Sequence, residues 1–143
     1  MSGEAFVDTN ILIYAACGAV DDPAKWARAW EIIGPGEYAI SGQVMAEFYV
    51  NATKKDERKK FVPLELGEAS RWMDRLAALS VVPVDHMIVL AAVKNSLRFQ
   101  VSYWDAALIS AADAIGSKVL YTEDLNHGQT YGSIKVINPF KAH

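Results

Sequence analysis

Short apolar runs alternate along this chain with longer segments that have helical spacing. The strand-like runs lie at residues 5–7, 37–40, 81–84, 119–121 and 134–137. Helical patterns lie at residues 10–16, 22–33, 41–51, 67–79, 86–99 and 102–115. Such alternation indicates βαβ units and a parallel sheet. The sequence therefore predicts an α/β fold in which the carboxyl ends of the strands open into one crevice, where sheets of this kind bind ligands.

Length and composition fit a single domain spanning residues 1–143. The chain is 52% hydrophobic and 22% charged, which is ordinary for a globular protein. Its one cysteine, Cys17, excludes an internal disulfide framework and agrees with a cytoplasmic location. No run of 18 apolar residues is present, so we expect no contact with a membrane. The net charge of −3 argues against a protein that coats nucleic acid, but not against an enzyme that acts on it.

Basic residues are concentrated in one short segment. The cluster consists of Lys54, Lys55, Arg58, Lys59 and Lys60. It fits a solvated helix end or loop, which is the more common role of a charge run. It also fits a rim that contacts phosphates beside the helix that carries Glu47.

Four acidic residues lie where strand patterns give way to helices. They are Asp8, Glu47, Asp105 and Asp124. Each adjoins an apolar stretch that is expected to be buried, and two carboxylates about 4 Å apart repel by roughly 4 kcal/mol at an effective dielectric near 20. Carboxylates gathered at one edge need a cation or a shared proton. Mg²⁺ and Mn²⁺ prefer carboxylate and water oxygens, and they activate water for attack on phosphodiesters. The pattern therefore predicts a divalent-metal site for phosphate chemistry.

Each acid also has a purely structural interpretation. Asp8 could cap the first helix. Ser102 and Asp105 have the spacing of a capping box, and Asp124 could hold an Asx turn. Glu47 is the hardest to explain in this way, because apolar residues surround it. The order of the four along the chain favours a common site.

The segments that carry these acids resemble the motifs of PIN domains. Residues 6–14 resemble the opening strand and its Asp-Thr-Asn motif, 41–48 the second motif, 102–109 the third, 120–125 the fourth and 137–140 the closing strand. The small size of the chain is most similar to the VapC group, the toxin ribonucleases of bacterial toxin–antitoxin pairs. The resemblance implies a three-layer α/β/α sandwich around a five-stranded parallel sheet.

The same resemblance implies the site residues, the cofactor and the partners. The four acids match the catalytic and metal-binding set of a Mg²⁺- or Mn²⁺-dependent endoribonuclease, and polar residues that usually support this set are matched by Thr9, Asn10 and Thr122. Glu123 stands next to Asp124 and could share or replace it. The expected partners are RNA, an antitoxin that inserts a basic residue into the acidic pocket, and a second copy of the chain. His127 is given no catalytic role.

Two other functions compete with this interpretation. A doubly wound phosphotransfer protein also places acids at strand ends, but a phosphatase of that type needs an Asp where Asn10 stands. A receiver needs an Asp at its third strand, and Asp85 is a poor match. A non-catalytic PIN-like binding module is the third possibility, which the intact acids argue against.

The aromatic residues allow two roles. Trp26, Trp30 and Trp72 are expected in helix packing, with an exposed groove for an antitoxin as the alternative. Tyr103 or Trp104, just before Asp105, could stack on a base.

Overall fold

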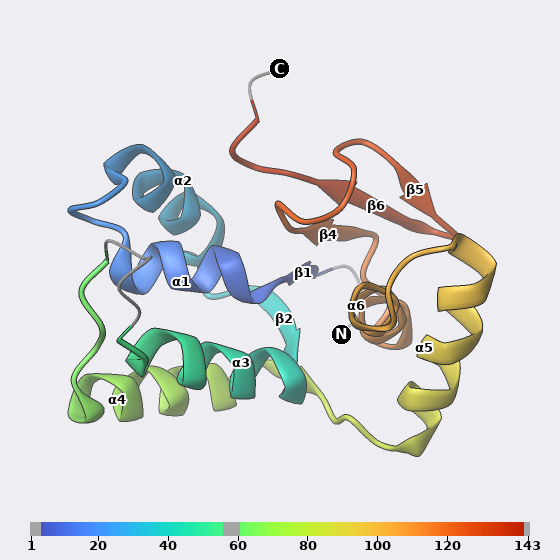
Figure 1. Ribbon diagram of the computed structural model, residues 1–143, viewed down its shortest axis with the longest axis horizontal. Helices are drawn as coiled ribbons and strands as arrows, with labels where there is room; N and C mark the ends of the chain where they lie inside the picture. The colour runs from blue at the N-terminus through green and yellow to red at the C-terminus, as the bar shows by residue number, and fades with distance from the viewer. Residues whose placement is uncertain (1–3, 56–60, 142–143) are drawn as a thin grey trace.

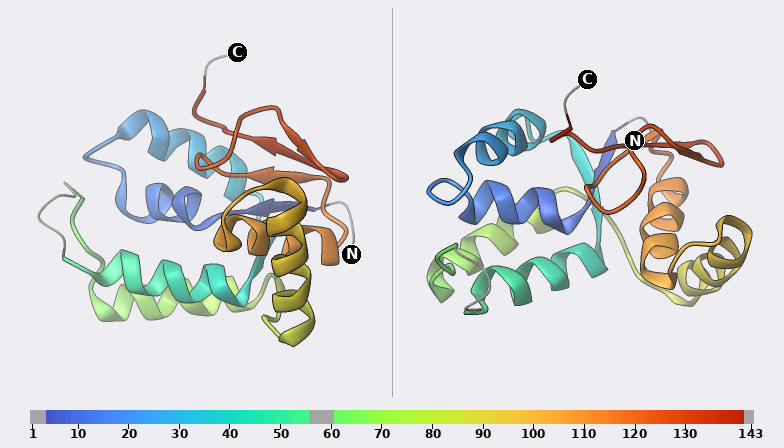
Figure 2. Two further views of the ribbon diagram at one scale, coloured as in Figure 1. Left: turned by 45° about the vertical axis from the view of Figure 1, so that its right-hand side comes forward. Right: turned by 45° about the horizontal axis from the view of Figure 1, so that its top comes forward.

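A central sheet carries helices on both faces in the computed structural model, which describes residues 4–55 and 61–141 (Figure 1). The strands are β1 (Ala5–Val7), β2 (Tyr38–Ser41), β3 (Ser80–Val82), β4 (Val119–Tyr121), β5 (Thr130–Tyr131) and β6 (Ile134–Ile137). The helices are α1 (Thr9–Cys17), α2 (Pro23–Ile33), α3 (Gly42–Thr53), α4 (Leu66–Ala77), α5 (His86–Phe99) and α6 (Tyr103–Ala114). Helices α1 to α4 lie on one side of the sheet, and α5 and α6 lie on the other (Figure 2).

The strand order is β3-β2-β1-β4-β6-β5. The first five strands of this order pair in parallel, which confirms the predicted five-stranded sheet. The sixth, β5, pairs antiparallel with β6 and was not predicted. It has only two residues, too few for a recognisable pattern, and it reaches β6 through a turn at Gly132, whose φ of 62° suits glycine.

Side-chain caps begin most of the helices where the sequence predicts them. Asp22 accepts a hydrogen bond from Lys25 N, Ser41 from Val44 N, Asp85 from Ile88 N and Ser102 from Asp105 N. Each bond satisfies one backbone N–H that the first helical turn leaves without a partner. No helix in the described ranges is long and apolar enough to cross a membrane.

Two of the tryptophans pack against the core, as predicted. The Trp30 indole N–H donates to Ala15 O at 2.8 Å, and the rings of Trp72 and Phe48 lie 5.4 Å apart. Trp26 is partly exposed. Trp104, at the start of α6, is 64% exposed. Helix α6 is instead buried along residues 106–112, where small side chains let it lie close to its neighbours.

The strand order reverses at β1, and this reversal positions the crevice. The strand pairs with β2 on one side and with β4 on the other. Connections that leave adjacent parallel strands toward opposite faces of a sheet open a crevice at the carboxyl ends of those strands. Asp8 directly follows β1, and residues 122–124 directly follow β4, so both segments meet there.

Candidate active site

Asp8 is the most tightly held acid of the crevice. Its backbone N–H donates to Tyr121 O at 3.0 Å and so extends the pairing of β1 with β4. Its Oδ1 accepts from Thr9 N at 2.6 Å, which caps α1, and its Oδ2 accepts from the Thr122 hydroxyl at 2.7 Å. The residue is only 4% exposed. The position of the Asp8 carboxylate is thus determined by three contacts: the pairing of β1 with β4, the cap on α1 and the hydroxyl of Thr122 after β4.

Burial raises the pKa of Asp8 to about 7. The hydrogen bonds from Thr122 and Thr9 lower it, whereas the charges of Asp124 and Glu47 raise it further. The groups of the protein around Asp8 therefore offset the negative charge of its ionised carboxylate only poorly. A cation placed beside it would relieve both the lost hydration and the repulsion.

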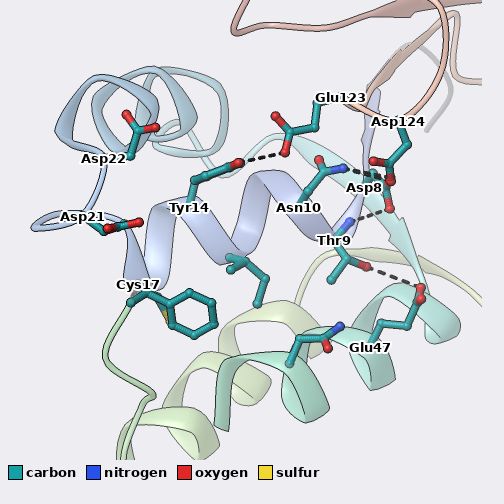
Figure 3. Close-up of a pocket in the computed structure, with 14 residues that line it drawn as sticks. Asp8, Thr9, Asn10, Tyr14, Cys17, Asp21, Asp22, Glu47, Glu123 and Asp124 are labelled. Carbon is teal, nitrogen blue, oxygen red and sulfur yellow. Dashed lines mark hydrogen bonds between the residues drawn. The ribbon is translucent and has the colours of Figure 1, made fainter. Parts of the chain in front are cut away.

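Asn10 lies between Asp8 and Asp124 and contacts both. Its amide nitrogen is 3.2 Å from Asp124 Oδ2, 3.4 Å from Asp8 Oδ2 and 3.5 Å from Thr122 Oγ1. Its Oδ1 is buried and has no hydrogen-bond partner among the described residues. A buried oxygen atom without a protein partner is usually bound by an ion or a water molecule. This oxygen is on the side of the amide turned away from the two carboxylates, because the amide nitrogen faces both of them (Figure 3).

The choice between Glu123 and Asp124 is made by their contacts. Asp124 N donates to Thr122 Oγ1 at 3.1 Å, and its carboxylate reaches Asn10. The Glu123 carboxylate instead accepts from the Tyr14 hydroxyl at 2.8 Å and pairs with Lys25 at 3.1 Å. Figure 3 shows Asp124 directed to Asp8 and Glu123 directed to Tyr14. Asp124 is thus the acid that faces Asp8.

The environment of Asp124 raises its pKa. Desolvation is the largest cause, followed by the charges of Asp105 and Glu123, while the Asn10 hydrogen bond opposes them. These influences connect Asp105 to the site, because its charge is felt at Asp124.

Glu47 approaches the same space from α3 (Figure 3). Its Oε1 lies 3.5 Å from Thr9 Oγ1 and 3.3 Å from Gln43 Nε2. The side chain is exposed, because Val44 and Phe48 turn the apolar face of α3 inward. The expectation that all four acids sit in buried surroundings is therefore wrong for Glu47, and also for the exposed Asp124.

Asp105 stands at the start of α6. Its N–H is capped by Ser102 Oγ at 3.1 Å, and its side chain is half-buried. It is absent from the residues that line the cleft, which include the other three acids. The structure therefore brings Asp8, Glu47 and Asp124 together and leaves Asp105 at the margin, near Asp124.

The cleft extends from these acids along α1 and has a volume of about 570 Å³. It is lined by Asp8, Thr9, Asn10, Ile13, Tyr14, Cys17, Gly18, Asp21, Asp22, Glu47, Asn51, Phe61, Glu123 and Asp124. Sequence reasoning assigned no role to Tyr14 or Asn51. The signal was present, because Asn10, Tyr14 and Cys17 share one face of α1 at i, i+4 and i+7, as Glu47 and Asn51 do on α3.

The remaining predictions concern residues around this cleft. Lys54 and Lys55 are exposed just beyond α3, and the other three members of the basic cluster lie outside the described residues. His127 Nδ1 accepts from Asn138 N at 2.9 Å, which ties the loop after β4 to the segment after β6. Tyr103 is half-buried, while the exposed Trp104 still matches the predicted base-stacking position.

The donor atoms at the site suit a hard cation. Within residues 4–55 and 61–141, no three Asp, Glu, His or Cys side chains are grouped closely enough to hold a metal ion among them. Mg²⁺, however, keeps several waters and takes one or two carboxylates directly. Asp8 and Asp124 provide carboxylate oxygens of that kind, and Glu47 lines the same cleft.

Comparisons with known proteins place this geometry in a family. The sequence model of the PIN domain matches residues 5–132. No curated protein matches the chain. The toxin-antitoxin complex from Klebsiella pneumoniae contains a chain that is similar with a TM-score of 0.70 and 18% identity, covering 97% of this chain and 100% of that one.

Two further solved structures show the same fold. The DNA-bound VapBC of Salmonella typhimurium has a TM-score of 0.63 and 18% identity, covering 94% of this chain and 96% of that one. The sarcin-ricin loop cleaving toxin VapC20 of Mycobacterium tuberculosis has a TM-score of 0.62 and 18% identity, covering 85% of this chain and 92% of that one.

Proposed function

The chain belongs to the PIN domain family, and we propose that it is a metal-dependent endoribonuclease. The observation that carries this proposal is the arrangement of Asp8, Asn10 and Asp124 at the carboxyl ends of β1 and β4. Two carboxylates converge there on one amide nitrogen, which lies 3.4 Å from Asp8 Oδ2 and 3.2 Å from Asp124 Oδ2. A bound Mg²⁺ or Mn²⁺ would offset the negative charge of the two carboxylates better than the protein does without an ion.

The residues divide the work of phosphodiester cleavage between them. Asp8 and Asp124 would hold the ion directly, while Glu47 and Asp105 would act through water. The bound ion would supply an acidified water and would offset charge on the phosphate in the transition state. Thr9 N and the Thr122 hydroxyl keep the Asp8 carboxylate in one orientation. The Glu47 carboxylate, which is exposed on the open side, would accept a proton from water that enters the cleft.

The solved relatives support a role as the toxin of a toxin–antitoxin pair. Similar chains occur in the complex from Klebsiella pneumoniae and in VapBC of Salmonella typhimurium, and a similar toxin cleaves the sarcin-ricin loop. We therefore extend the proposal to a VapC-type toxin that cuts RNA and is bound by an antitoxin. The acid-lined cleft would accept a basic side chain of that partner.

A homodimer is also part of the proposal, and α5 offers a surface for it. Its outward residues Met87, Leu90, Val93 and Leu97 are 47–78% exposed and follow helical spacing. A continuous apolar stripe of this kind is typical of an interaction site. Multi-angle light scattering should show a dimer that Leu90→Asp converts to a monomer, whereas Asp74→Lys, a charge change on the exposed side of α4, should have little effect.

The phosphotransfer alternative is supported less well. A phosphatase of that type needs a second Asp two residues after the first, and Asn10 occupies that place. Incubation with a small phosphodonor followed by intact mass should therefore show no added phosphate.

Cleavage of total RNA tests the principal proposal. The wild-type protein should cut in Mg²⁺ or Mn²⁺ and stop in EDTA. Asp124→Asn should be inactive, while Asp74→Asn, on the exposed side of α4, should retain full activity. Cleavage that survives EDTA, or an active Asp124→Asn protein, would contradict the proposal.

A further inference from the structure

Glu123 borders the acidic site, yet residues from two other elements hold its carboxylate. We propose that Tyr14 and Lys25 are positioning residues that keep Glu123 out of the site, so that Asp124 alone of this pair faces Asp8. The inference rests on the proposed function only in taking the site to bind a divalent cation. It assigns a role to two residues that the catalytic description does not use.

The three side chains form a closed triangle of hydrogen bonds. The Tyr14 hydroxyl lies 2.8 Å from Glu123 Oε1, and Lys25 Nζ lies 3.1 Å from Glu123 Oε2. Lys25 Nζ also donates to the Tyr14 hydroxyl at 3.1 Å. Both carboxylate oxygens are therefore occupied, and the charge is matched by an ammonium group. The side chains of Lys25 and Glu123 are 33% and 24% exposed, so neither moves freely in solvent.

Lys25 itself is held in place by its surroundings. It lies in the first turn of α2, where its backbone N–H donates to the Asp22 cap at 3.2 Å. Its ammonium group lies 4.7 Å from the centre of the Tyr14 ring and 5.2 Å from that of Phe140. Those two rings pack edge to face at 5.0 Å. Cation–π contacts at these distances favour one position of the lysine.

The triangle has a consequence for the neighbouring acid. Thr122 Oγ1 accepts from Asp124 N and so shapes the turn after β4. Within this turn the two neighbouring acids point apart, Asp124 toward Asp8 and Glu123 toward Tyr14 (Figure 3). A released Glu123, one methylene longer than Asp124, could bring its carboxylate next to those of Asp8 and Asp124. It would then compete with Asp124 for the cation.

A double-mutant cycle separates this role from simple stabilisation. Tyr14→Phe removes only the hydroxyl, and Lys25→Met removes the charge at similar length. Each is made alone and together with Glu123→Gln, and Mn²⁺ affinity is measured by calorimetry on the full chain. In the wild-type background we expect each change to alter the Mn²⁺ dissociation constant by at least about threefold, through the freed Glu123. In the Glu123→Gln background the same changes should have no effect.

Two controls guard against misfolding and nonspecific charge effects. Lys25→Arg keeps the ion pair and should restore the wild-type dissociation constant, and Lys94→Met on α5 removes an exposed lysine away from the site. A thermal melt in EDTA shows whether each variant folds. Should Lys25→Met fail to fold, Tyr14→Phe and Lys25→Arg decide the question.

Each outcome decides the proposal. The proposal would be overturned if Tyr14→Phe and Lys25→Met changed the Mn²⁺ dissociation constant equally with and without the Glu123 carboxylate. It would also be overturned if they changed it in neither background. Failure of the wild-type protein to bind Mn²⁺ at millimolar concentration would also overturn the proposal, because Glu123 would then have no cation site to be excluded from. A protein that binds Mn²⁺ but cuts no RNA would overturn the proposed nuclease function, and the Mn²⁺ cycle would still decide the positioning role.

Discussion

The two walls of the acidic cleft are built differently. On the wall formed by the ends of β1 and β4, Asp8 and Asp124 are joined through Asn10 and Thr122 by hydrogen bonds of 2.7–3.4 Å. On the other wall, Glu47 projects from α3, while Asp105 at the start of α6 stands at the margin of the cleft. Glu47 reaches the site only through a 3.5 Å contact with Thr9. The strand-end wall is held by backbone geometry, whereas the helix-borne acids are free to adjust.

This difference separates two tasks. A preorganised group contributes most to catalysis when its position needs no adjustment during the reaction. An exposed acid that works through water tolerates small displacements and contributes less. The strand-end wall should therefore determine whether the site works at all, and the helix-borne wall should modulate its rate. The following substitutions test that ranking.

Asp8→Asn should have the largest effect on cleavage. It removes the charge of the most buried acid while preserving its shape and its cap on α1. We expect a loss of roughly 10³-fold in kcat/KM, the upper range for the removal of one preorganised electrostatic group. Single-turnover cleavage of a defined RNA measures it, with Asp113→Asn on the exposed end of α6 as the matched control. If kcat/KM of the Asp8→Asn protein stayed within tenfold of the wild-type value, the strand-end wall would not have the dominant role.

The same residue should make the metal-free protein less stable as the pH rises. Burial raises the pKa of Asp8 to about 7 from its ordinary value of 3.8, so between these values the native state keeps a proton that the unfolded chain has lost. Stability is then fully present below about pH 4 and falls until about pH 7, by up to roughly 4 kcal/mol. Urea unfolding in EDTA measures this slope.

Asp8→Asn provides the control for that slope, since it removes the titrating group. The variant should be more stable than wild type at pH 8 in EDTA, and the difference should vanish near pH 4. A wild-type protein equally stable at both pH values would show that the Asp8 carboxylate is better compensated than its burial indicates.

Much of the strand-end wall was predictable from the sequence, because local signals produce it. The Asp-Thr-Asn segment follows an apolar run, and a carboxylate at that point both ends a strand and caps a helix. The position of Ser102 as a cap was predictable for the same reason. Short-range chemistry determines these features, and the structure agrees with them.

The contacts of Glu123 were not predictable, because its partners lie far away in the sequence. Lys25 is 98 residues from it, and nothing local distinguishes this lysine from an ordinary residue in the first turn of a helix. The exposure of Glu47 was also misjudged. Its apolar neighbours in sequence point to the other side of α3, as helical geometry requires once the buried face is known.

Thr122→Val should have an intermediate effect. The hydroxyl donates to Asp8 and accepts from Asp124 N, so its loss loosens both strand-end acids at once. Supporting contacts to metal ligands are typically worth about 10- to 100-fold in affinity or activity. We expect a weaker Mn²⁺ affinity by calorimetry within that range, while Thr130→Val on the edge strand β5 should leave the affinity unchanged. Equal affinities in the two variants would remove Thr122 from the supporting set.

Glu47→Gln should have the smallest effect of the series. The side chain is exposed and keeps its contacts with Thr9 and Gln43 as an amide, so the fold and the strand-end wall should remain intact. We expect kcat to fall by about tenfold or less, within the lower range for a residue that assists proton transfer through water, while Mn²⁺ affinity stays close to wild type. Comparison of kcat with the Mn²⁺ dissociation constant distinguishes this result from loss of a ligand. If Glu47→Gln weakened Mn²⁺ binding as strongly as Asp8→Asn, the helix-borne acid would be a direct ligand, and the two walls would have equal roles.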